Sequence, residues 1–312
     1  MSFALVFPGQ GSQSVDMMSA YGENAVIRQT FTEASEALGE DLWQMVCEGP
    51  AEKLALTVNT QPLMLTAGVA VYRAWCAAGG AQPAMLAGHS LGEYSALVAA
   101  GALDFADAVP LVRFRAQAMQ DAVPAGEGAM AALLGLEVEA VREACAEAAQ
   151  GEVVEAANLN APGQIVIAGA RGAVERAIEA AKARGAKRAM LLPVSAPFHC
   201  ALMKPAAERL HERLVGVTLH TPKIAVLNNA DVASVSTPDA IRDALVRQAF
   251  SPVRWIETIE AMAAAGVQQV FECGPGKVLA GMNKRIAKQL GGGALHDAAS
   301  LEDAIKTVGE AA

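Results

Sequence analysis

This sequence of 312 residues shows neither a long apolar run nor, in its first residues, the pattern of a leader segment. No stretch approaches the roughly 20 consecutive apolar residues that cross a bilayer. The first residues, MSFALVFPGQGSQ, have neither a basic start nor a small-residue cleavage site. We therefore expect a soluble, cytoplasmic protein that does not bind membranes.

Cysteines are few, odd in number and scattered. The chain has five of them, and no two form a CxxC pair: Cys47, Cys76, Cys145, Cys200 and Cys273. A disulfide framework or a zinc site needs paired or closely spaced cysteines. We expect buried thiols and no metal.

Positive charge is also in deficit, because 24 Lys and Arg face 33 Asp and Glu, for a formal net charge of −9. This balance argues against general nucleic-acid binding. Two basic clusters remain, and each is either a solvated helix face or a patch for an acidic partner. They are Lys182, Arg184, Lys187 and Arg188, and Lys284, Arg285 and Lys288.

The composition, 53% hydrophobic, supports one large domain or two closely packed ones. Strand and helix patterns alternate in the first part of the chain, which indicates a mainly parallel α/β sheet. The strands lie at 3–7 and 84–88, and the helices at 24–38, 60–77, 90–100 and 104–121. The segment PAGEG at 124–128 ends this alternation.

After this break the order becomes βαββαβ, which is typical of a ferredoxin-like unit. Its elements are strand 128–134, helix 137–150, strands 153–158 and 164–169, helix 171–184 and strand 187–192. Helices and strands then return at 200–214, 238–249, 267–272 and 276–289, before Gly291, Gly292 and Gly293 indicate a flexible connection to a last short helix.

These patterns predict a large α/β domain at 1–124 and 197–312 with a small ferredoxin-like domain, 125–196, inserted into it. The two junctions lie beside Arg115 and His199. A cleft between the domains is therefore expected to contain both side chains.

Ser90 lies at a predicted strand-to-helix corner. The segment GHSLG at 88–92 has the Gly-x-Ser-x-Gly pattern of a nucleophile elbow, with a strand before it and a helix after it. At the helix N-terminus, free N–H groups and the helix dipole favour a developing anion. The alternative is an ordinary N-cap serine.

A serine nucleophile needs a base, and the chain has five histidines. His211 and His220 flank the C-terminal end of a helix, His296 lies in the Gly-rich tail, and His89 is expected to point away from its neighbour Ser90. His199 remains, just after Pro197 and at the start of a helix, where it can reach across a cleft. The alternative is a half-buried histidine with its hydrogen bonds satisfied.

The glycine-rich segment FPGQGSQ at 7–13 is not a dinucleotide fingerprint, because it lacks the third glycine and a suitably placed acidic residue. It is either a tight structural turn or a turn whose N–H groups around Gln10 face a ligand oxygen.

Five ordered motifs together resemble the malonyl-CoA:acyl carrier protein transacylases of fatty-acid synthesis and the acyltransferase domains of polyketide synthases. They are FPGQGSQ, GHSLGEY, RAQAMQ, PFHCALM and GPGKVL. The resemblance covers nearly the whole chain. It implies an α/β fold with a large α/β-hydrolase-like domain around a mainly parallel sheet and the small ferredoxin-like insertion.

The resemblance also implies a reaction. Ser90 attacks malonyl-CoA while His199 takes its proton, and the malonyl-serine ester is then passed to the phosphopantetheine thiol of an acidic acyl carrier protein. The kinetics should be ping-pong. No cofactor is implied, and we expect a monomer.

Further roles follow from the same resemblance. The backbone N–H groups of Gln10 and Leu91 would hold the oxyanion. The main-chain carbonyl of Gln248 would orient His199. Replacement of the Gln248 side chain should therefore be milder than replacement of His199.

Specificity is assigned to Arg115, which would grip the malonyl carboxylate through a bidentate pair. An acetyl donor would leave this buried guanidinium unpaired. Arg113, two residues away, should face elsewhere. Phe198 and Met119 would crowd an α-methyl group, or else simply pack in the core.

Two rival functions share some of these features. A serine esterase or thioesterase of the α/β-hydrolase class would have the order Ser, acid, His, with the histidine near the C-terminus, whereas 113 residues follow His199 here. A non-catalytic docking module for carrier proteins would keep all of its function after Ser90→Ala.

Overall fold

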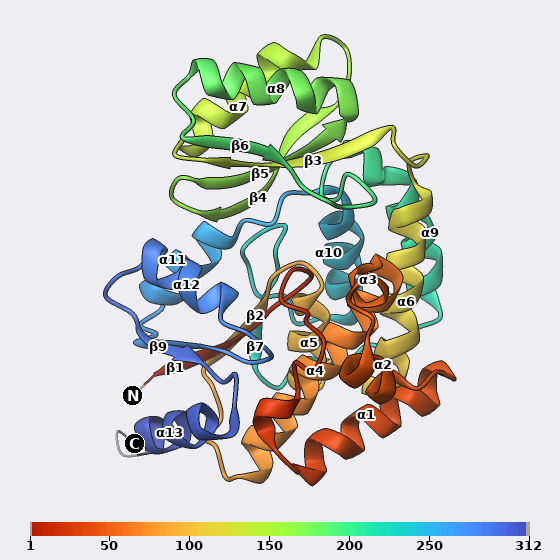
Figure 1. Cartoon of the computed structure of the whole chain (residues 1–312). Helices are drawn as coiled ribbons and strands as arrows, with labels where there is room; N and C mark the ends of the chain where they lie inside the picture. The colour runs from red at the N-terminus through yellow and green to blue at the C-terminus, as the bar shows by residue number, and fades with distance from the viewer. Residues whose placement is uncertain (1, 310–312) are drawn as a thin grey trace.

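The computed structural model describes residues 2–309, which form a mixed α/β protein with two separate sheets (Figure 1). A five-stranded sheet has the order β7-β2-β1-β8-β9, and all of its neighbouring strands are parallel. Its strands are β1 (Phe3–Phe7), β2 (Met85–Gly88), β7 (Ala225–Leu227), β8 (Gln269–Glu272) and β9 (Gly291–Ala294). The parallel sheet predicted from the alternating pattern is confirmed.

Both faces of this sheet are buried, as the side chains of β1 illustrate. Its sequence FALVF is apolar throughout, and successive side chains point to opposite faces. Phe3, Leu5 and Phe7 pack against α4 (Thr57–Ala77) and α5 (Gly92–Ala99). Ala4 and Val6 pack against α11 (Trp255–Ala264) and α12 (Val278–Ile286). Helices therefore cover the sheet on two sides.

Several helices lie close to their predicted positions, whereas those at 19–21, 42–48, 51–55 and 255–264 were not predicted. Those expected at 24–38, 104–121, 137–150 and 171–184 begin and end within two residues of the observed bounds. These and the other helical elements are η1 (Ser19–Tyr21), α1 (Ala25–Leu38), α2 (Leu42–Glu48), α3 (Ala51–Ala55), α6 (Phe105–Asp121), α7 (Val138–Ala149), α8 (Arg171–Ala183), η2 (Ala201–Met203), α9 (Lys204–Val215), α10 (Pro238–Phe250) and α13 (Ala298–Gly309). In the described part of the chain no helix has the length and apolar character needed to cross a membrane.

The second sheet is antiparallel, with the strand order β4-β5-β3-β6. Its strands are β3 (Gly128–Leu134), β4 (Val154–Ala161), β5 (Gln164–Ala170) and β6 (Arg188–Leu191). One face packs on α7 and α8, and the opposite face looks toward the rest of the molecule (Figure 1). Met130 and Val166 on this second face join an apolar cluster that includes Met119 and Phe198.

The glycine run near the C-terminus is ordered, and the prediction of a flexible connection there was wrong. Gly291 to Ala294 form β9, which pairs in parallel with β8. A Cβ on Gly292 would lie 2.2 Å from the carbonyl oxygen of Val270, so a residue without a side chain is needed for this close approach. Three glycines have little conformational preference of their own, and pairing with β8 fixes them as a strand.

The expectation of buried thiols holds for only part of the set. Cys145, Cys200 and Cys273 are buried, whereas Cys47 is half-buried and Cys76 is exposed. Cys76 lies in the last turn of α4, where the helix leaves the core. All five are free thiols, and among residues 2–309 no group of three His, Cys, Asp or Glu side chains is placed to hold a metal ion.

Candidate active site

Ser90 occupies a sharp corner between β2 and α5, with a backbone φ of +52°. Such a conformation is strained for a residue with a side chain. The flanking glycines make it possible: a Cβ on Gly88 would lie 1.8 Å from the carbonyl carbon of Gly92, and one on Gly92 would lie 2.0 Å from the carbonyl oxygen of Phe7. The corner presents the Ser90 hydroxyl at the start of α5, as the elbow pattern predicts.

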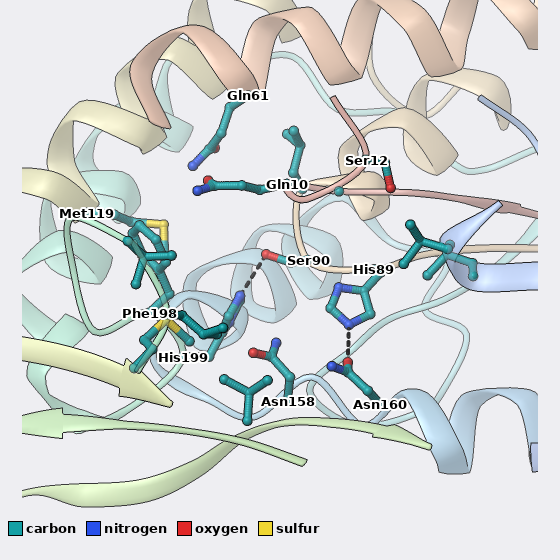
Figure 2. Close-up of a pocket in the computed structure, with 18 of the residues that line it drawn as sticks. Gln10, Ser12, Gln61, His89, Ser90, Met119, Asn158, Asn160, Phe198 and His199 are labelled. Atoms are coloured by element: carbon teal, nitrogen blue, oxygen red, sulfur yellow. Dashed lines mark hydrogen bonds between the residues drawn. The ribbon is translucent and has the colours of Figure 1, made fainter. Parts of the chain in front are cut away.

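His199 faces this hydroxyl. Its Nε2 lies 2.7 Å from Ser90 Oγ (Figure 2). Its Nδ1 lies 3.0 Å from the backbone oxygen of Gln248. A carbonyl only accepts, so Nδ1 carries the proton and Nε2 is left to accept the serine proton. Burial and the nearby Arg115 cation lower the pKa of His199 to about 3. The imidazole is therefore neutral at pH 7.

The two side chains open into a cavity of about 220 Å³ between the sheets. The parallel-sheet side contributes Gln10, Ser90 and His199, and the antiparallel sheet contributes Met130 and Val166. A reacting group seated here would be enclosed by both parts of the protein. The cleft expected near the two junctions is present.

Gln10 and Leu91 line the same cavity. The loops that carry them approach closely, since a Cβ on Gly9 would lie 2.5 Å from the carbonyl oxygen of His89. Within residues 2–309, neither the N–H of Gln10 nor that of Leu91 donates a hydrogen bond to another group of the protein. Both N–H groups are thus available to a ligand oxygen.

Arg115 is buried on α6 and reaches the reacting hydroxyl. Its Nη2 donates to Ser90 Oγ at 3.3 Å and to Gln248 Oε1 at 2.9 Å, and Nη1 donates to Gln61 Oε1 at 2.8 Å. Burial lowers its pKa from the ordinary arginine value. The expectation that this guanidinium is unpaired without a ligand carboxylate was wrong, because two neutral amide oxygens already accept from it.

This arrangement joins a nucleophile, a neutral base, two free N–H groups and a cation in one cavity. It suits the attack of a serine on a carbonyl compound that carries a negative charge a few atoms away. Over residues 4–304 the chain matches the family described as acyl transferase domain.

The chain belongs to the acyl transferase family.

Relatives with known names agree. The malonyl CoA-acyl carrier protein transacylase of Escherichia coli is 55% identical over 97% of this chain and 99% of that protein. A crystal structure of the acyl-carrier-protein S-malonyltransferase from Burkholderia pseudomallei has a TM-score of 0.97 at 61% identity, covering 98% of this chain and 100% of that one. A malonyl-transacylase in complex with its type II PKS acyl-carrier protein has a TM-score of 0.97 at 52% identity, with coverage of 98% and 100%.

Of the other side chains named in the prediction for this acyl transferase, two line the cavity and one lies outside it. Met119 and Phe198 line the cavity and belong to the same apolar cluster. Their position is therefore compatible both with contact to an acyl group and with packing in the core. Arg113 faces elsewhere, as expected, and pairs with Glu40 through two contacts of 2.9 Å.

His89 also lines the acyl transferase cavity, with its ring turned toward β4 rather than toward the serine hydroxyl (Figure 2). Its Nε2 lies 2.8 Å from Oδ1 of Asn160, and its ring packs 5.5 Å from that of Trp255. His89 therefore joins the two sheets across the cavity. His211, His220 and His296 are not among the lining residues.

No role was predicted from the sequence for several polar residues of the site, among them Gln61, Glu93 and Asn229. Glu93 is buried, and burial raises its pKa to about 7 against the lowering effect of its hydrogen bonds and of Arg115. The one signal was a charged residue on the apolar helix GEYSALVA. Asn229 and Gln61 lie far from the motifs in the sequence and carry no comparable signal.

Gln248 contributes more than its carbonyl. Its side-chain Nε2 donates to Ser90 O at 3.0 Å and to Glu93 Oε2 at 2.9 Å, while Oε1 accepts from Arg115. These contacts give the side chain a role beside that of the carbonyl, and the expectation that its replacement is milder than that of His199 stays a prediction. We now expect its removal to disturb Arg115.

Proposed function

We propose that this acyl transferase moves a malonyl group from malonyl-CoA to the phosphopantetheine thiol of an acyl carrier protein in fatty-acid biosynthesis. The names of the most similar relatives support the reaction. The observation that carries the substrate class is the buried Arg115 guanidinium 3.3 Å from Ser90 Oγ. A donor whose carbonyl meets Ser90 and whose free carboxylate meets Arg115 is a short dicarboxylic acyl thioester.

In the first half-reaction, Ser90 Oγ attacks the thioester carbonyl and its proton passes to His199 Nε2. The oxyanion is held by the N–H groups of Gln10 and Leu91, each worth about 3 kcal/mol of transition-state stabilisation. The C–S bond then breaks, and the leaving sulfur takes the proton from His199. The products are CoA and a malonyl ester of Ser90.

The second half-reaction runs the same steps with another thiol. The carrier thiol gives its proton to His199, and its sulfur attacks the ester carbonyl. The C–O bond to Ser90 breaks, and the serine oxygen recovers the proton. Because the first product leaves before the second substrate reacts, the kinetics are ping-pong.

Selectivity for malonyl arises because the charged carboxylate of the donor replaces a neutral amide oxygen as a hydrogen-bond acceptor of Arg115. The donor carboxylate takes the place of the Gln61 amide oxygen on Arg115, while Gln248 keeps its contact with Nη2. The guanidinium then faces an opposite charge, which adds a Coulomb attraction that a neutral amide does not supply. An acetyl group offers no such exchange. Phe198 and Met119 form the wall that limits the space for an α-methyl group.

The esterase alternative needs an acid on the histidine. Here His199 Nδ1 donates to the backbone oxygen of Gln248, in the place where a serine esterase carries a carboxylate. This neutral acceptor stabilises an imidazolium less than a carboxylate would, which supports transfer to a thiol over hydrolysis.

Incubation of the protein with malonyl-CoA alone tests the proposal. Intact-protein mass spectrometry should find a lasting malonyl adduct, absent from Ser90→Ala, and addition of the carrier protein should remove it. Ser12→Ala, a second serine lining the cavity, should label normally. Rapid release of free malonate without a carrier would indicate the esterase, and full activity of Ser90→Ala would indicate a docking module.

We also propose a division into a large α/β-hydrolase-like domain, 1–124 and 197–312, and a ferredoxin-like domain, 125–196. The βαββαβ element order and the strand order β4-β5-β3-β6 support the second description. The cytoplasmic location, the monomeric state and the absence of a cofactor stay predictions.

The carrier protein is proposed to meet α12. In the other basic cluster, Lys182 pairs with Glu179 and Arg184 with Glu147, whereas Lys187 and Arg188 are in no ion pair among residues 2–309. The place of the clusters relative to the cavity therefore favours one over the other. Among residues 2–309, Lys284 on α12 and Lys288, two residues after its end, form no ion pair. Three residues of α12, Val278, Leu279 and Met282, line the cavity. An acidic carrier docked here has a short path to Ser90.

A further inference from the structure

One buried carboxylate of the site has no part in the proton transfers. Glu93 lies in the first turn of α5 and is 2% exposed. Its Oε2 accepts two hydrogen bonds, from Gln248 Nε2 at 2.9 Å and from the backbone N–H of Asn229 at 2.8 Å. Burial of a carboxylate costs free energy unless hydrogen bonds compensate for the lost water. The two groups that donate to Glu93 therefore indicate its role.

The first contact decides which way the Gln248 amide points. An amide has one accepting oxygen and one donating nitrogen, which can be exchanged by rotation. The oxygens of Glu93 and of the Ser90 backbone only accept from the nitrogen. Gln248 must therefore turn Nε2 to them, and Oε1 is left facing Arg115 Nη2 at 2.9 Å.

The second contact reaches the corner that carries the nucleophile. Asn229 Oδ1 accepts from the N–H of Ser90 at 2.7 Å, and its Nδ2 donates to Gly88 O at 2.7 Å. Glu93 holds the backbone of Asn229 and thereby keeps this side chain against the strained corner.

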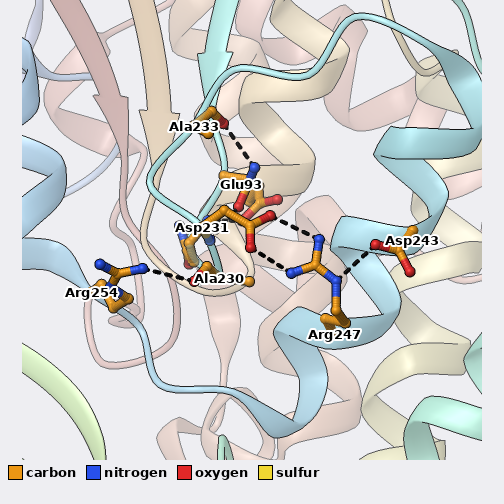
Figure 3. Close-up of polar contacts among 9 residues, drawn as sticks. Glu93, Ala230, Asp231, Ala233, Asp243, Arg247 and Arg254 are labelled. Carbon is orange, nitrogen blue, oxygen red and sulfur yellow. Dashed lines mark hydrogen bonds and ion pairs between the residues drawn. The ribbon is translucent and has the colours of Figure 1, made fainter.

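The loop 228–233 that carries Asn229 is also fastened from its outer side. Arg247 donates to Asp231 at 2.6 and 2.8 Å and to Asp243 at 2.7 Å (Figure 3). These outer contacts are partly exposed, and among residues 2–309 neither Asp231 nor Asp243 has a side-chain hydrogen bond to Gln248 or Arg115. The loop thus has an inner attachment at Glu93 and a separate outer one at Asp231.

We infer that Glu93 is a positioning residue for malonyl selectivity: it holds the Gln248 amide in the orientation that aims Arg115 at the acyl pocket beside Ser90. The inference rests on the proposed malonyl transfer. Without an acceptor at position 93, the nitrogen of the Gln248 amide keeps only the Ser90 carbonyl as its acceptor, and the amide rotates more easily. Its nitrogen can then face Arg115, two donors meet, and the guanidinium leaves its place.

The test measures the ratio of malonyl to acetyl loading in competition, together with kcat, KM and thermal stability. Glu93→Met fills the space without an acceptor, and Glu93→Ala is a second variant in case the first does not fold. Each should lower the ratio about tenfold, mainly through a higher KM for malonyl-CoA. Glu93→Gln, whose amide oxygen can accept from both donors, should restore most of the ratio.

Two further variants locate the effect. Gln248→Ala should lower the ratio to a similar extent, and the double variant Glu93→Ala/Gln248→Ala should lower it no further, because both changes act through one contact. Asp231→Asn, on the outer side of the same loop, should lower the melting temperature and leave the ratio unchanged.

A wild-type ratio in Glu93→Met or Glu93→Ala, or additive losses in the double variant, would overturn the inference. A wild-type protein that does not load malonyl at all would instead overturn the proposed function. The two failures are therefore distinguishable.

Discussion

At the scale of single residues, the site depends on a histidine that stays uncharged. Burial and then Arg115 lower the pKa of His199, which keeps the base free but also makes it weak. In the proposed reaction, a malonyl carboxylate paired with Arg115 would cancel part of the positive field on the imidazole. The malonyl donor would thus raise the pKa of the base, whereas an acetyl donor would not.

The pKa of His199 predicts a pH dependence of stability. The folded value is about 3, below the value of about 6.5 for an unfolded histidine. As the pH falls from 6.5 toward 3, His199 binds a proton in the unfolded chain but stays neutral in the folded protein. The free energy of unfolding therefore falls.

Urea unfolding of the wild type and of His199→Gln at a series of pH values checks this. The wild type should lose more stability than the variant on acidification, with a difference on the order of 4 kcal/mol once titration is complete. Parallel curves for the two proteins would show that the histidine is not held neutral.

Arg115 is the second prediction at this scale. Arg115→Ala should lower the malonyl-to-acetyl loading ratio by about 10- to 100-fold, because a charge-assisted contact is worth about 1.5–3 kcal/mol. Competition between the two thioesters, read by mass spectrometry, measures it. Arg113→Ala removes a pair with Glu40 outside the cavity and should keep the ratio. Strong malonyl preference in Arg115→Ala would remove this account of specificity.

At the scale of elements, the β2–α5 corner explains why the nucleophile can be presented at all. The carbonyl oxygen of Phe7 on β1 lies where a side chain on Gly92 would begin. Strand β1 also pairs with β2, from Ala4 with Met85 to Phe7 with Gly88. Neighbouring strands and the helix start are packed as one rigid unit around Ser90.

Gly92→Ala should therefore destabilise the fold by on the order of 3 kcal/mol or more, since its Cβ would meet backbone that cannot move aside. Gly281→Ala on α12 is the matched control, because no atom lies within 4 Å of its added Cβ. That change should stabilise by about 0.5–1 kcal/mol. Chemical denaturation compares the two, and equal effects would contradict the close packing at the corner.

At the scale of the whole molecule, the active cavity exists only where the two sheets meet. Backbone hydrogen bonds join Val253 to β4, and Arg285 on α12 donates to Gln164 and to the carbonyl of Pro162. His89 and Asn160 add a contact across the cavity. The antiparallel sheet is thus held over Ser90 from several sides, and α12 lies at this junction.

The position of α12 predicts where the carrier protein acts. Lys284→Glu and Lys288→Glu should slow transfer from the preformed malonyl-enzyme to the carrier several-fold at low salt, and added salt should reduce the difference between variant and wild type. Starting from the loaded enzyme separates carrier binding from CoA binding. Lys182→Glu should behave as wild type, and an equal loss there would place the docking surface elsewhere.

Many residues of the site could be predicted because they lie in short contiguous motifs of the sequence. The glycines around Ser90 follow from local sterics, and the βαββαβ order follows from residue periodicity. Glu93 was not predictable, because its partner Gln248 lies 155 residues away. The same holds for Gly291 to Gly293, whose strand depends on pairing with β8.

The sequence by itself determined the elbow at Ser90, the βαββαβ order of the second sheet and the family, because each rests on local sterics, periodicity or contiguous motifs. Only the tertiary structure decided which groups hold Arg115, which way the Gln248 amide points, and that a flexible-looking glycine run is a strand. Those outcomes depend on hydrogen bonds and packing between segments that are distant in the chain, and such contacts leave no local pattern to detect.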